Sequence, residues 1–227
     1  MLIPRIIFLI FLLMCGMPNL YAQGEGRQYE VTPFYGTRFG GNIDLSQQGN
    51  PNVDFLNIKS SENYGVMAGV SFWRDFQGEF MWNRQPTSLS AHNPNDGSYS
   101  FLSDMNLDMY QFDALYQIPH SLWKLRPFVV AGLGFSHFGV QPVNGQQVLG
   151  FSNRFSYNLG GGVKYFFNRH WGVRAEARWS PSHTTQGETV YCDPYFGCAP
   201  AAVANKAQQG QANIGLIFRF DRLFGHL

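Results

Sequence analysis

The chain has 227 residues, a formal net charge of +1, 16% aromatic residues and 25 glycines. This balanced charge lacks the basic surplus of a nucleic-acid-binding protein, so no nucleic-acid partner is predicted. From residue 23 onward no apolar run reaches about 18 residues, which excludes a membrane-spanning helix from that part of the chain.

Residues 1–22 have the pattern of a secretory signal peptide. Arg5 precedes an apolar block over residues 6–14, and the small residue Ala22 ends the segment. A membrane anchor would need about 20 apolar residues, which this block lacks. A lipoprotein site at Cys15 would need a small residue where Met14 stands. We predict cleavage after Ala22, which leaves one formally neutral domain over residues 23–227.

Eight segments of alternating apolar and polar residues follow, and this period of two predicts β-strands. They cover about residues 28–39, 63–73, 78–85, 104–118, 126–138, 155–167, 171–179 and 213–220. Short links alternate with long polar stretches, the longest at residues 41–61 and 182–208. Because proline cannot donate to a strand ladder, Pro86 and Pro181 are expected to end their strands. Pro33 is expected to need a bulge or a late strand start.

The seventh segment illustrates the pattern. Its first face carries Trp171, Val173, Ala175, Ala177 and Trp179, and its second carries Gly172, Arg174, Glu176 and Arg178. Charges at every second position suit a strand with one apolar and one polar face. Eight such strands predict an all-β fold, an eight-stranded antiparallel up-and-down transmembrane β-barrel with a cleaved signal peptide.

A soluble barrel with its apolar face inside would have the same strand count. Three features favour lipid outside. Aromatic residues gather at strand ends, as at membrane interfaces. The other face combines glycine with charges of both signs, which suits a narrow barrel interior filled by side chains. A closed barrel also leaves no strand edge in lipid.

Segments 31–41, 126–134, 158–165 and 171–179 resemble the small outer-membrane β-barrel family of the OmpA/OmpX type. The final strand resembles the family's C-terminal assembly signal through Asn213, Gly215, Phe218 and Phe220. The resemblance implies a bacterial outer membrane, the lipid bilayer and the barrel-assembly machinery as partners, periplasmic termini and four extracellular loops. The chain continues past Phe220 to Leu227, and it carries no peptidoglycan-binding domain.

Inward-facing charges are the main candidate functional residues. They are Glu30, Arg38, Asp113, Lys164, Arg174, Glu176, Arg178 and Arg219. They form either an ion path or a network of ion pairs that fills the lumen. Unpaired charge in a narrow interior is costly, so the mixed signs favour the filled lumen.

No catalytic residue, metal site or cofactor is predicted. Ser136 and His137 point to opposite faces of a strand, and Ser182 and His183 begin a loop of unconstrained geometry. No His/Cys spacing matches a zinc site. No helix follows the glycines at 160–162, so they are not a phosphate-binding loop. Family members include lipid-modifying enzymes and narrow channels, which remain the alternatives to a non-enzymatic structural or surface-interaction role.

Cys192 and Cys198 lie close together in an exported chain, which predicts a disulfide. The closed loop either staples a long connection or presents Tyr195 and Phe196 to a surface partner. Both interpretations stay open.

Overall fold

The computed structural model describes residues 28–44, 55–92, 95, 97–119, 125–140, 153–183, 188–193, 197–202 and 206–220. The predicted signal peptide and the tail after Phe220 lie outside these residues. Strands account for all the regular structure of the described part. None of its residues forms a helix long and apolar enough to cross a membrane.

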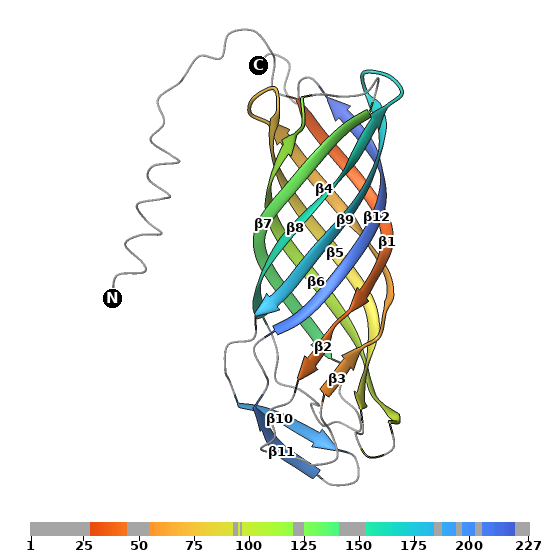
Figure 1. Cartoon of the computed structure of the whole chain (residues 1–227), viewed down its shortest axis with the longest axis vertical. Coiled ribbons are helices and arrows are strands. Elements are labelled where there is room, and N and C mark those ends of the chain that lie inside the picture. Colours follow the sequence, from red (N-terminus) through yellow and green to blue (C-terminus); the bar gives the residue numbers. More distant parts are fainter. Residues whose placement is uncertain are drawn as a thin grey trace, which may run out of the picture.

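Eight strands form the wall of the described structure. They are β1 (Tyr29–Gly40), β4 (Ser61–Ser71), β5 (Phe76–His92), β6 (Tyr99–Gln117), β7 (Leu125–Val140), β8 (Asn153–Phe166), β9 (Trp171–His183) and β12 (Lys206–Phe220). Each pairs antiparallel with its neighbours, and the pairing of β1 with β12 closes the ring. Figure 1 shows these tilted strands as a barrel. The predicted eight-stranded antiparallel barrel is confirmed.

Four short strands lie in stretches that were predicted to be loops. They are β2 (Asn42–Asp44), β3 (Phe55–Ile58), β10 (Glu188–Asp193) and β11 (Gly197–Ala202). β3 pairs with β2 and with the far part of β5, whereas β10 and β11 pair only with each other. All four lie at the end of the barrel opposite the short turns at residues 72–75 and 167–170 (Figure 1). We call these two ends the loop side and the turn side.

The expectations for three prolines were wrong, for one physical reason. β5 continues through Pro86, β9 continues through Pro181, and β1 keeps one register on both sides of Pro33. On one side of each proline the ladder is interrupted. β5 leaves β4 after Arg84 and meets β3 only from Leu89. Because no hydrogen bond is required at these gaps, the missing N–H costs nothing.

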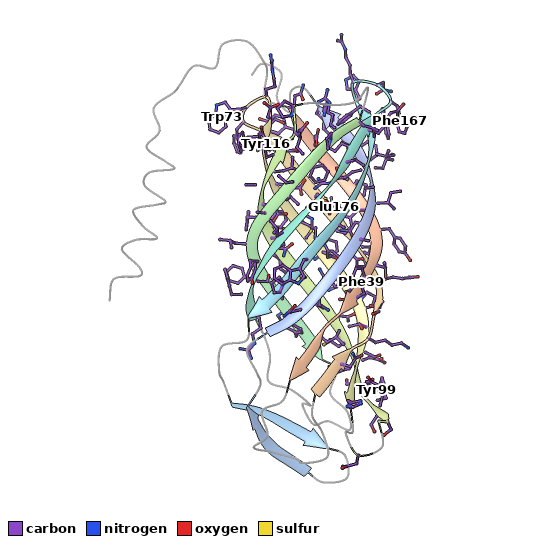
Figure 2. The ribbon with its side chains drawn as sticks, in the orientation of Figure 1. Phe39, Trp73, Tyr99, Tyr116, Phe167 and Glu176 are labelled. Atoms are coloured by element: carbon purple, nitrogen blue, oxygen red, sulfur yellow. The ribbon has the colours of Figure 1, made fainter. Side chains whose placement is uncertain are left out.

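Side chains alternate across the wall as predicted. In β1, Glu30, Thr32 and Arg38 are buried, whereas Tyr35 and Phe39 are about half exposed. Large apolar side chains on the outer face include Phe72, Trp73, Tyr110, Phe112, Leu133, Leu159, Trp171, Ile214 and Phe220. Trp73 and Phe167 lie on the turn side, and Phe39 lies farther down the wall (Figure 2). The outward face is therefore apolar, whereas the lumen holds the charged and amide side chains together with some apolar ones.

Candidate functional site in the lumen

The lumen is lined largely by polar side chains because the inward face of most strands carries the charged and amide residues of the alternation. Glycine on neighbouring strands provides room for them. A Cβ on Gly132 would lie 1.8 Å from Asp113 Oδ1, and one on Gly162 would lie 2.9 Å from the Cβ of Glu176. These glycines therefore make space for carboxylates.

The turn-side end is organised around Glu30. Its carboxylate accepts from Lys164 Nζ at 2.6 Å and from Arg219 Nη2 at 2.7 Å. Gln77 completes the group, because its Nε2 donates to Glu30 at 3.1 Å and its Oε1 accepts from Lys164 at 2.6 Å. The Arg219 guanidinium also lies 3.7 Å from the ring centroid of Phe166. β1, β5, β8 and β12 are thus connected across the lumen by charge-assisted hydrogen bonds.

Arg174 and Arg178 organise the centre from β9. Both contact Glu79 on β5, with Arg178 Nη2 2.7 Å from Glu79 Oε1. Both also contact Glu176, at 2.6 Å from Arg174 Nη2 and 2.8 Å from Arg178 Nε. Arg178 further pairs with Asp113 on β6. Glu176 lies midway along the barrel (Figure 2). Two guanidinium groups thus hold three carboxylates, and the centre is bridged wall to wall.

Amide side chains continue the network toward the loop side. Asn213 donates to Glu176 Oε1 at 3.1 Å and accepts from Asn63 at 2.9 Å. Asn83 donates to Gln211 Oε1 at 2.9 Å, and the same oxygen accepts from Arg38 Nη2. Asn213, predicted from the assembly signal, therefore also belongs to the lumen network.

An apolar layer lies beyond the amides. Leu107 and Phe138 are directly opposed on β6 and β7, and Ile58 and Leu89 are opposed on β3 and β5. All four are buried. The loop-side end of the lumen is thus covered by hydrophobic side chains.

The structure places all eight predicted charges inside the lumen, each at most 7% exposed. Seven of them contact an oppositely charged side chain of the network, whereas Arg38 contacts none among the described residues. Sequence reasoning missed Glu79, which contacts both central arginines. The sequence did contain a signal for Glu79. It alternates with Phe80 and Trp82, which places it on the same face as Asn83 and opposite the two aromatic residues.

Other candidate residues are separated or fall outside the described part. Ser136 is buried in the wall, whereas His137 is exposed and hydrogen-bonded to Asn153 at 3.0 Å. They lie on opposite faces, as predicted. The side chains of Ser182, His183, Cys192 and Cys198 are outside the described residues, although the backbone register opposes Cys192 to Cys198. Among the described residues, no three His, Cys, Asp or Glu side chains are grouped to hold a metal ion.

A profile of the family described as "Outer membrane protein beta-barrel domain" matches residues 7–220. The chain belongs to this family. It is therefore a β-barrel of the bacterial outer membrane, embedded in the lipid bilayer. Among curated protein sequences, none matches this outer-membrane barrel.

Solved structures show the same fold at low sequence identity. The outer membrane protein OprG from Pseudomonas aeruginosa superposes with a TM-score of 0.64 at 11% identity, over 86% of this chain and 96% of OprG. AlkL, determined in DMPC bilayers, gives 0.61 at 13% identity, over 92% and 98%. Neisserial surface protein A gives 0.55 at 14% identity, over 86% and 100%. These similarities support the barrel fold alone.

Proposed function

We propose that this outer-membrane β-barrel has a structural or surface-interaction role, with no enzymatic activity and a lumen closed to solutes. One observation carries the proposal. Arg178 contacts Glu79, Asp113 and Glu176, so its guanidinium links β9 to β5 and β6 across the centre. Opening a path there would leave several buried charges unpaired, which is strongly unfavourable.

The loop-side region supports a surface role. β5 and β6 have 17 and 19 residues, whereas a membrane-spanning strand needs about 9–11. On the outer face, Arg84 and Asp108 form a bidentate pair with both distances 2.8 Å. We take this pair as the loop-side limit of the apolar belt. The β5–β6 hairpin continues beyond it, where it would extend outside the lipid.

The proposed orientation puts both termini in the periplasm. β1 starts and β12 ends on the turn side (Figure 1). Bacterial outer-membrane barrels have short periplasmic turns and longer extracellular loops. The β10–β11 hairpin would then be extracellular and available to a surface partner. Protease treatment of intact cells tests this, because cleavage between residues 184 and 205 is expected, and complete protection would contradict it.

Planar-bilayer recording tests the closed lumen. We expect the folded protein to give no steady single-channel steps, because ion pairs fill the centre. Reproducible steps from the wild-type protein would instead support a narrow channel. Incubation with outer-membrane lipids followed by mass spectrometry tests the enzyme alternative, and a modified lipid would overturn the non-enzymatic role.

We also propose that Asn213, Gly215, Phe218 and Phe220 are read by the barrel-assembly machinery. Phe218 and Phe220 lie on the outward face at the turn-side end of β12, and Phe220 is 43% exposed. Phe220→Ala is expected to lower the amount of folded protein in the outer membrane. Unchanged levels would contradict an assembly role.

A further inference from the structure

Within the part of the chain that the structure describes, the charges buried in the lumen do not balance. On described residues, its buried carboxylates are Glu30, Glu79, Asp113 and Glu176. Its buried cations are Arg38, Lys164, Arg174, Arg178 and Arg219. The other buried acid, Asp108, faces outward and pairs with Arg84. Five positive charges therefore face four negative ones.

The excess charge belongs to Arg38. Its side chain is 0% exposed, and its Nη2 donates to the neutral Gln211 Oε1. Among the described residues, its Nε and Nη1 find no hydrogen-bond partner. A guanidinium does not deprotonate in a protein, so it cannot escape the cost of burial by becoming neutral.

Further unused donors lie beside Arg38 on neighbouring strands. Gln211 opposes Arg38 in the β1–β12 pairing, and Gln209 opposes Gly40. On the other side of β12, Ser180 opposes Gln209. Gln209 Nε2, Gln211 Nε2 and Ser180 Oγ are all buried and have no partner among the residues that the structure describes. Because directly opposed residues have Cβ atoms about 4.5–5.5 Å apart, Arg38, Gln211, Gln209 and Ser180 are neighbouring side chains on β1, β12 and β9. We call these four residues the Arg38 patch.

We propose that this patch binds one small monovalent anion of the halide class. An anion beside the Arg38 guanidinium would balance the single excess charge and accept from its Nε and Nη1. The amide and hydroxyl groups would supply further donors, as uncharged groups do around a buried anion. The patch and the neighbouring apolar residues Ile58, Leu89, Leu107 and Phe138 are all buried, which would shield the anion from water. The proposal is independent of the surface role.

Crystallography with bromide tests the site directly. Residues 23–227 would be refolded in detergent and crystallised with sodium bromide in place of chloride. We expect an anomalous peak within hydrogen-bonding distance of Arg38 Nε and Nη1. Only water, or no density, at this position in the wild-type protein would overturn the proposal, whatever the role of the loops.

Urea unfolding in lipid vesicles gives a second test. Equal ionic strengths of sodium chloride and sodium gluconate would be compared. With chloride at about ten times its dissociation constant, the folding equilibrium constant should be roughly tenfold higher in chloride. Arg38→Met should remove this difference, and Arg84→Gln on the outer face should retain it. Equal wild-type stability in both salts, a full effect in Arg38→Met, or its loss in Arg84→Gln would overturn the assignment.

Discussion

The two halves of the lumen fill the same barrel in different ways. On the turn side, Glu30, Gln77 and Lys164 satisfy one another, and the central arginines each contact at least two carboxylates. On the loop side, some buried polar atoms have no partner within the described part of the chain; they belong to Arg38, Asn63, Gln85, Gln111, Ser156, Ser180, Gln209 and Gln211. The turn-side half, taken with the centre, is thus held together by ion pairs, and we call it the ion-paired half. The loop-side half instead has donors and acceptors left for a ligand or water.

Removing a carboxylate from the ion-paired half should have the largest effect on the free energy of unfolding. Glu79→Gln keeps the shape but leaves Arg174 and Arg178 short of one negative charge. We expect a loss of about 3–5 kcal/mol in the free energy of unfolding, measured by urea titration in lipid vesicles. Glu62→Gln, on the exposed face of β4, is the control and should cost less than about 1 kcal/mol. Equal losses in the two variants would contradict the conclusion that ion pairs in this half stabilise the barrel.

Two glutamines compare the halves directly. Gln77→Leu removes hydrogen bonds to Glu30 and Lys164, so we expect a loss of about 1.5–3 kcal/mol. Gln111→Leu removes an amide whose nitrogen and oxygen both lack partners, so stability should change by less than about 1 kcal/mol or increase. The same urea titration measures both. A larger loss for Gln111→Leu would show that the two halves were assigned the wrong way round.

Crowding of Asp113 tests how tightly the charged centre is packed. The Cβ of Gly132→Ala would overlap the Asp113 carboxylate, and overpacking of this kind costs about 1–3 kcal/mol. Gly139→Ala is a control on the same strand, because its Cβ would meet its nearest atom at 3.4 Å. Thermal unfolding, followed by heat-dependent gel mobility, should separate the two variants. Identical midpoints would indicate that Asp113 moves away freely.

The smallest effect is expected outside the barrel. Opposed residues on antiparallel strands have Cα atoms about 4.5–5.5 Å apart, within the range of a disulfide, so the register supports a Cys192–Cys198 bond. Because β10 and β11 pair only with each other, Cys198→Ser should change barrel stability by less than about 0.5 kcal/mol. Mass spectrometry should detect alkylation of the wild-type thiols only after reduction. Labelling without reduction would contradict the bond.

Much of the fold was predictable because it depends on local alternation. Successive residues of a strand point to opposite faces, so the segment 171–179 was enough to assign Arg174, Glu176 and Arg178 to one face. Strand ends were less predictable. Whether Pro86 ends a strand depends on the neighbour that would accept its hydrogen bond, and β4 has already diverged there. The residue itself carries no such information.

By itself, the sequence determined the barrel class and which charged side chains share one face of a strand, because a period of two is a property of each strand alone. The tertiary structure decided which charges meet. Arg178 and Asp113 are 65 residues apart and come together only through the registers of the strands between them. Register and closure likewise bring Glu79 between two arginines and leave Arg38 opposite neutral Gln211. Partner choice in the lumen is therefore a consequence of strand pairing around the whole ring.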